Sequence, residues 1–212
     1  MPNHKAIQEE WNRLGAKLKR NDERLRPIIE EVGKPTPNFK SDPFSALATS
    51  ILSQQLAPGA ARAITQRVSA LLPLSKWDPK VLIECSDQQL RDCGVSQRKA
   101  TYLKNLSQFW LETKFSSKCR KLSDEELEKQ LTSIVGVGQW TVHMFQIFCL
   151  GRVNILPVGD YGVRRGVQLL FGHSEAIKPR ELPEIVGHWN GAYSVASWYV
   201  WQGLNRKLIG KA

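Results

Sequence analysis

Two features of the sequence combine residue types that could bind a phosphate and stabilise a cation. The first is a Gly-x-Gly turn, Gly136-Val137-Gly138, which lies between two stretches of helical periodicity. Glycines let a backbone turn with positive φ and approach a phosphate closely, because no Cβ intervenes. The second feature is Asp160, which follows a Pro- and Gly-containing loop. Its carboxylate could cap the next helix or stabilise developing positive charge.

The elements that must position these residues are predicted to be helices. Capping signals occur at Asp42-Pro43, Ser86 with Gln89, and Ser123 with Glu126. The one strand-like segment, 153–158, is interrupted by Pro157, so we predict an all-α fold. The expected helices span about 7–18, 22–32, 43–52, 58–71, 86–94, 96–110, 123–134, 140–150, 160–171 and 194–208.

The charge balance favours a polyanionic partner. Thirty Lys and Arg residues against 20 Asp and Glu give a net charge of +10 and a pI near 9.6. Cations are concentrated between Arg91 and Lys121. This cluster is either a solvated helix face or a phosphate-facing surface whose binding to a polyanion would weaken with salt.

The cysteines and the apolar residues predict a soluble intracellular protein. The four cysteines form no CxxC pair and no cluster typical of an iron–sulfur site, so we expect reduced, half-buried thiols. The N-terminus lacks the apolar core of a secretion signal, and no apolar run approaches the ~18–20 residues of a membrane span. We expect no membrane association.

Three segments, GVGQWT at 136–141, LPVGDYGVRR at 156–165 and SVASWYVW at 194–201, resemble the helix-hairpin-helix (HhH-GPD) DNA glycosylase superfamily. Within it, the chain is most similar to the 3-methyladenine DNA glycosylase II family, in particular its short, single-module, yeast-type members. The resemblance covers about 43–201. It implies one domain over 1–212, with one lobe at about 45–130, a second formed by the N-terminal helices and 131–212, and a DNA-binding cleft between these two fused helical lobes.

The resemblance also implies a function in base excision repair. A monofunctional glycosylase would rotate an alkylated purine, of the 3-methyladenine or 7-methylguanine type, out of the duplex and hydrolyse its N-glycosidic bond. Asp160 would be the catalytic carboxylate, and it also precedes a helix as an N-cap would. Trp140 stands where strand-cleaving relatives carry a Schiff-base lysine, so a lyase reaction is not expected. Trp140, Met144 and Ala192 would line the base pocket, unless Trp140 is simply a core residue.

Other residues are assigned to DNA contacts by the same resemblance. Gln54, Gln55 and Leu56 match the segment that enters the duplex, with Gln55 as the best match to the plug, although a plain loop is the alternative. No cofactor is implied, except a monovalent or divalent cation at hairpin carbonyls near Val135 and Val137. The expected phosphate-binding residues are Gly136, Val137, Gly138, Gln139, Thr141, Arg164 and Lys99.

The sequence departs from the family around the base pocket. Gly191, Ala192 and Tyr193 replace a proline, a pocket aromatic and an arginine, and Met144 replaces a tyrosine found in some relatives. Fewer aromatic faces predict a weaker grip on a cationic purine. The alternative hypothesis is therefore a protein that binds abasic sites or lesions with little or no excision.

The expected partner is double-stranded DNA containing damaged bases or abasic sites. A sequence-specific regulator is disfavoured, because neither a dimerisation segment nor a recognition helix is apparent. We expect a monomer, located in the nucleus if the source is eukaryotic and otherwise in the cytoplasm.

Overall fold

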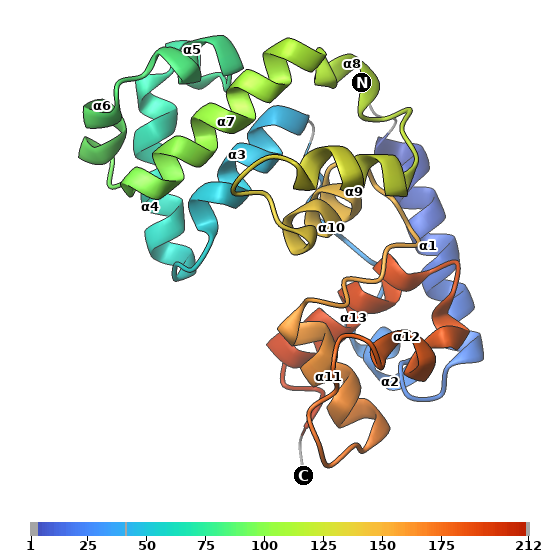
Figure 1. The fold of residues 1–212 in the computed structure, drawn as a ribbon. Helices are drawn as coiled ribbons and strands as arrows, with labels where there is room; N and C mark the ends of the chain where they lie inside the picture. The colour runs from blue at the N-terminus through green and yellow to red at the C-terminus, as the bar shows by residue number, and fades with distance from the viewer. Residues whose placement is uncertain (1–3, 41, 211–212) are drawn as a thin grey trace. The chain divides into compact units, whose positions relative to one another are not determined.

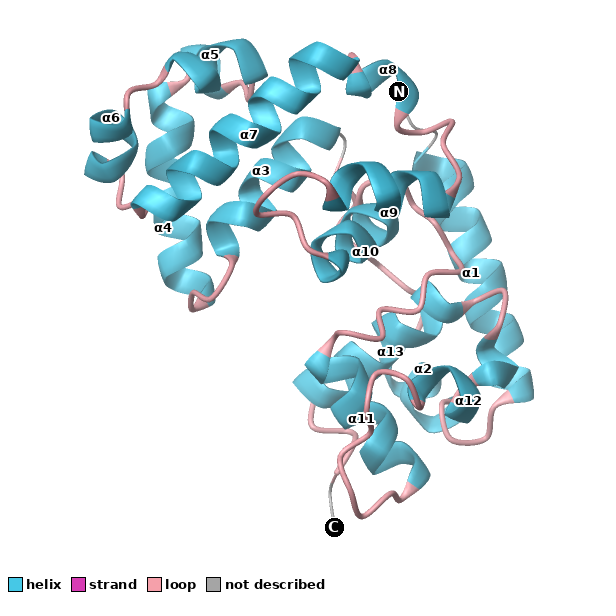
Figure 2. Ribbon diagram, viewed as in Figure 1, coloured by secondary structure: helices cyan, strands magenta, loops and turns pink. Residues whose placement is uncertain are grey.

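The computed structural model describes residues 4–40 and 42–210. Within these ranges the chain forms helices joined by loops and no strand (Figures 1 and 2), which confirms the all-α prediction. The α-helices are α1 (His4–Asn21), α2 (Arg26–Val32), α3 (Pro43–Ser53), α4 (Pro58–Leu71), α5 (Pro79–Glu84), α6 (Asp87–Asp92), α7 (Gln97–Thr113), α8 (Phe115–Lys118), α9 (Asp124–Thr132), α10 (Gln139–Phe148), α11 (Tyr161–Phe171), α12 (Leu182–Ile185) and α13 (Tyr193–Asn205).

The predicted helix starts are mostly confirmed by the caps. The Asp42 side chain accepts the Ser45 N–H, and the boxes that begin at Ser86 and Ser123 both form. The helix expected from Asp22 is wrong at its start, since α2 begins at Arg26. Oδ1 of Asp22 instead accepts the backbone N–H groups of Arg24 and Leu25, at 2.8 and 2.9 Å, and so forms a turn.

The contacts divide the chain into two compact units. Unit 1 contains Met1–Phe39 and Gln146–Ala212, and unit 2 contains Lys40–Phe145. The Gly-x-Gly hairpin therefore belongs to the same unit as the loop at 53–56, and α10 crosses the division. Asp160 belongs to unit 1.

Unit 2 is built around α7. Helices α3 and α5 both pack against α7 and lie beside it in Figure 1. Leu47 and Ile51 of α3 and Leu103 and Leu106 of α7 are fully buried at apolar positions of helical spacing. This packing places the first turn of α7 close to the last turn of α3.

Unit 1 is organised by the contact between α11 and α13. A Cβ on Gly166 would lie 2.2 Å from Cγ1 of Val200, so glycine allows the close approach of the two helices. The strand-like segment at 153–158 forms no strand. Its Val153 carbonyl accepts the Ser194 N–H at 3.0 Å, and the Ile155 N–H donates to Oγ of Ser194 at 3.0 Å. These bonds fix the chain that leads to Asp160 against the start of α13.

The cysteines are reduced and more deeply buried than expected. All four are free and buried, so the expectation of half-buried thiols is corrected. In the described part of the chain, no helix is both long and apolar enough to cross a membrane.

Candidate functional site

The hairpin requires glycine at its first position only. Gly136 has φ of +103°, and a Cβ there would lie 2.2 Å from Cγ of Tyr102. The turn closes where the Val137 N–H donates to the Ile134 carbonyl at 2.9 Å, and Val137 is buried. Tyr102, on α7, packs against the hairpin at Gly136. The sequence pattern does not reveal this contact.

Gly138 differs from Gly136. It does not adopt positive φ, contrary to the expectation for both glycines, and a Cβ there would meet no atom within 4 Å. It immediately precedes α10, and its carbonyl accepts the Val142 N–H at 3.1 Å. Neither backbone conformation nor packing within the described chain requires glycine here. The open space at the start of a helix suits an external anion approaching the first N–H groups.

The exposed face of α10 carries the expected pocket residues. Trp140 is 42% exposed, so it is not the core residue of the alternative interpretation. Met144 is half-buried and lies four residues further along, on the same face of α10. Thr141 is buried.

Gln139 is bonded within the protein. Its Nε2 donates to Oε1 of Glu128, on α9, at 2.7 Å. Oε2 of the same carboxylate lies 3.7 Å from Nε2 of buried His143. Burial lowers the pKa of His143, and the charge of Glu128 opposes this only in part. Glu128 thus fixes the beginning of α10, next to the hairpin.

The loop after α3 holds its side chains in different environments. Nε2 of Gln54 donates to the Gly136 carbonyl at 3.0 Å, which ties the loop to the hairpin. Gln55 is exposed and has φ of +55°, a left-handed conformation that is uncommon outside glycine. Leu56 is exposed as well. The expected plug residue is therefore the one that projects from a strained turn.

Lys99 reaches this loop from the first turn of α7. Its Nζ donates to the carbonyls of Leu52 and Gln54, both at 2.7 Å, and burial lowers its pKa. Together these segments line a pocket of about 460 Å³ in unit 2. The lining residues are Ser53, Gln54, Gln55, Ser96, Arg98, Lys99, Tyr102, Gly138, Trp140 and Thr141.

Asp160 caps α11, as its position before Tyr161 predicted. Oδ1 accepts the Val163 N–H at 2.8 Å and the indole N–H of Trp201, on α13, at 2.9 Å. The Trp201 ring lies against Phe148, with centroids 5.7 Å apart. The role of Trp201 was missed in the sequence, although it stands in the SVASWYVW segment. Two donors from two helices thus orient a half-buried carboxylate.

Other expected site residues in unit 1 have internal roles. Nη1 of Arg164 donates to the Ile177 carbonyl at 3.0 Å, while its buried Nε has no hydrogen-bond partner among the described residues. Ala192 is only 2% exposed, directly before α13. It offers little surface to a base in this structure.

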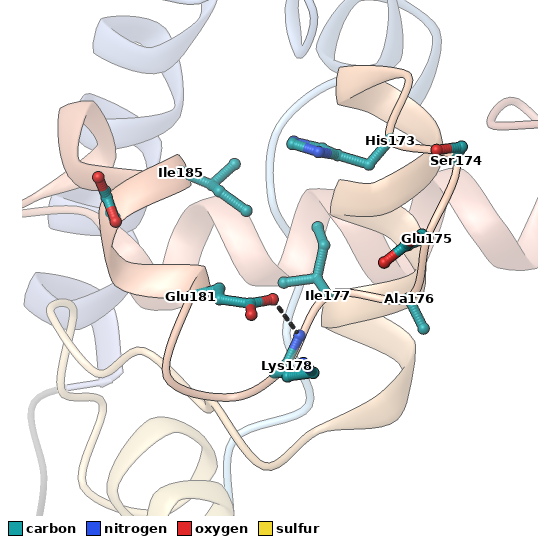
Figure 3. A pocket seen from close by; sticks show the side chains of 9 residues that line it. His173, Ser174, Glu175, Ala176, Ile177, Lys178, Glu181 and Ile185 are labelled. Atoms are coloured by element: carbon teal, nitrogen blue, oxygen red, sulfur yellow. Dashed lines mark hydrogen bonds between the residues drawn. The ribbon is translucent and has the colours of Figure 1, made fainter.

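A separate pocket of about 440 Å³ in unit 1 is formed by the segment that follows α11 and by residues of α12 (Figure 3). It is lined by the segment 173–178 together with Glu181, Glu184 and Ile185. Oε2 of Glu181 accepts the Lys178 N–H at 2.9 Å. None of the expected site residues lines this pocket.

Part of the basic cluster between Arg91 and Lys121 is paired within unit 2. Arg91 donates to the side chains of Gln88 and Gln97, and Lys104 forms an ion pair with Asp87. Nε of Arg98 donates to the Tyr102 hydroxyl at 2.5 Å, and Arg98 is exposed beside the hairpin. These cations already bond to neighbouring side chains. A phosphate would therefore compete with those bonds in this part of the cluster.

Comparison with known proteins gives matches along most of the chain. The model of the family described as "HhH-GPD superfamily base excision DNA repair protein" matches residues 48–190. Two relatives are from Schizosaccharomyces pombe. The alkylbase DNA glycosidase-like protein mag2 is 28% identical over 91% of this chain and 93% of its own, and DNA-3-methyladenine glycosylase 1 is 31% identical over 85% and 82%.

A solved structure is similar over nearly the whole fold. It is the 3-methyladenine DNA glycosylase of the same yeast in complex with abasic DNA, with a TM-score of 0.80 and 28% identity. The match covers 91% of this chain and 97% of that one.

Proposed function

This chain belongs to the HhH-GPD superfamily of base excision DNA repair proteins, and we propose that it is a monofunctional DNA glycosylase for alkylated purines. The relatives named 3-methyladenine DNA glycosylases support this substrate class. The partner would be double-stranded DNA with damaged bases or abasic sites, bound by a monomer. In a eukaryotic cell, we propose that the protein acts in the nucleus.

Binding would begin at the sugar–phosphate backbone. The open position at Gly138 and the N–H groups at the start of α10 suit one phosphate. The exposed Gln55 would occupy the space that the rotated nucleotide leaves, which offsets part of the lost stacking. Trp140 would stack on the electron-poor ring of the base.

Asp160 would then promote hydrolysis. As the glycosidic bond breaks, the purine leaves with the bonding electron pair and positive charge develops on the sugar. The carboxylate stabilises that charge and orients a water molecule, whose oxygen bonds to C1′ and whose proton passes to the solvent. Trp140 offers no amine, so no Schiff base forms and the strand stays intact.

A cation site at the hairpin is compatible with the donors present. Val135 and Val137 help to line a pocket of about 360 Å³ at the turn, and their carbonyl oxygens are suitable ligands for a hard cation. Within the described residues, no His, Cys, Asp and Glu side chains are grouped to hold a metal. These carbonyls would hold the cation, whose positive charge would offset the negative charge of a nearby DNA phosphate.

The observation that carries the enzymatic proposal is the orientation of Asp160 by Val163 and Trp201. The test is the release of methylated purines from alkylated duplex DNA by the wild type and by Asp160→Asn. Asparagine also caps helices, so the variant should stay folded. We expect release by the wild type and its loss in the variant, with binding to abasic DNA retained. Absence of release by the wild type would overturn the proposal.

The burial of Ala192 favours a second candidate, a binder of abasic sites or lesions. A pocket without an aromatic at this position holds a cationic purine weakly. Tight binding of abasic DNA without release of any methylated purine would support this candidate.

A further inference from the structure

The Lys99 side chain donates hydrogen bonds to backbone carbonyls at the C-terminal end of α3. The last carbonyls of a helix lack intrahelical partners, and a cation there is stabilised by the helix dipole. Leu52 is in the last turn of α3, and its carbonyl accepts a hydrogen bond from the Lys99 ammonium. The same ammonium binds the Gln54 carbonyl beyond the helix end. An ammonium has three donors, and two of them are engaged here.

These bonds hold Gln54 at two points. Lys99 donates to the backbone carbonyl of Gln54, and the side-chain amide of Gln54 donates to the Gly136 carbonyl of the hairpin. The next residue, Gln55, adopts its left-handed conformation immediately after this double attachment. A non-glycine residue persists in such a conformation when its surroundings hold it there.

We propose that Lys99 is a positioning residue that holds Gln55 ready for insertion before DNA arrives, and is not itself a phosphate contact. This inference rests on the proposed DNA-binding function and deepens it. The family resemblance instead predicts a phosphate contact for Lys99, and the two roles predict different DNA-binding behaviour. Each phosphate contact contributes ~0.9 to the slope of log K against log salt, whereas a positioning residue changes lesion preference without changing that slope.

The experiment compares the wild type with Lys99→Met, Lys99→Arg and Lys76→Met. Lys76 is an exposed cation of unit 2 that lies outside both the pocket and the basic cluster, so its variant controls for the loss of one charge. Affinity is measured for a duplex with a tetrahydrofuran abasic site and for the same duplex intact, over a series of salt concentrations. Thermal unfolding verifies that each variant is folded.

We expect Lys99→Met to reduce the preference for the abasic duplex about tenfold, with the salt slope unchanged. Lys99→Arg, which keeps donors for both carbonyls, should restore part of the preference, and Lys76→Met should keep all of it. If Lys99→Met reduces the slope of log K against log salt by ~0.9 and leaves the preference for the abasic duplex unchanged, Lys99 contacts a phosphate and the inference is overturned. If Lys99→Met does not fold, Lys99→Gln takes its place. This variant retains an amide donor and should lose part of the preference for the abasic duplex.

Failure of the proposed function has a different signature. A wild type that does not prefer the abasic duplex would contradict the insertion of Gln55 itself. A wild type with that preference and a Lys99→Met variant equal to it would contradict only the role of Lys99.

Discussion

Trp201 donates its indole N–H to Oδ1 of Asp160 at 2.9 Å, and this bond joins α13 to the cap of α11. Gly162 lies beside it, since a Cβ there would be 3.1 Å from Oδ1 of Asp160 and 3.3 Å from Nε1 of Trp201. The glycine therefore leaves room for the indole to reach the carboxylate. Orientation of Asp160 thus depends on two helices whose sequences are separated by the whole of α12.

Replacing Trp201 by phenylalanine tests whether this bond supports catalysis. The variant keeps an aromatic ring against Phe148 but removes the donor. A hydrogen bond to a charged group contributes ~1.5–3 kcal/mol, so we expect single-turnover excision to slow by about 10- to 100-fold. Trp198→Phe, on the same helix, is the matched control, and equal rates for the two variants would contradict a role for the bond.

Substitutions of the two hairpin glycines should have different effects, one on stability and the other on DNA binding. Gly136→Ala places a Cβ against Tyr102 and strains φ, so we expect a loss of unfolding free energy of roughly 2 kcal/mol or more. Gly138→Ala meets no atom and should remain within about 1 kcal/mol of the wild type. We nevertheless expect Gly138→Ala to bind duplex DNA more weakly, because its Cβ would obstruct the phosphate. Undiminished binding by Gly138→Ala would argue against a phosphate at this position.

Trp140 should matter for the base and not for folding. Since Trp140 is 42% exposed, Trp140→Ala should melt close to the wild type. Loss of stacking on a base costs ~1–3 kcal/mol, so we expect excision of cationic purines to fall by about 5- to 150-fold. Binding to abasic DNA, which presents no base, should change much less. A uniform loss on both substrates would show that Trp140 contacts the backbone instead.

Asp22 should make unit 1 sensitive to acid. Burial alone would raise the pKa of this carboxyl, which is 3% exposed, but hydrogen bonds from Trp189, Leu25, His188 and Arg24 outweigh burial and lower it. The lowered pKa means that the carboxylate stabilises the fold above its unfolded pKa of about 4, and that this contribution is lost as pH falls through the folded value.

Asp22→Asn should therefore be less stable at neutral pH, by roughly 2–3 kcal/mol, and its stability should fall less steeply below about pH 4. Chemical denaturation at several pH values measures both effects. Glu10→Gln is the control, because Glu10 lies in an exposed ion pair with Arg13 and should change stability little. Parallel pH profiles for Asp22→Asn and the wild type would rule out this role for Asp22.

Features that depend on residues a few positions apart can be predicted from the order of the amino acids. The caps at Asp42, Ser86 and Ser123, the glycine turn and the N-cap position of Asp160 are local, since each involves residues a few positions apart. Helical periodicity was sufficient to predict an all-α fold, because burial of one face repeats with the period of the helix.

Contacts between residues that are far apart along the chain become known only from the packing of the helices. Lys99 binds carbonyls 45 and 47 residues away, Tyr102 packs under Gly136, and Trp201 reaches Asp160 across 41 residues. Asp22, expected to start a helix, instead accepts bonds from residues 166 and 167 positions further along. Such contacts arise from the packing of whole helices, which places side chains of any sequence separation together, and no local spacing encodes them.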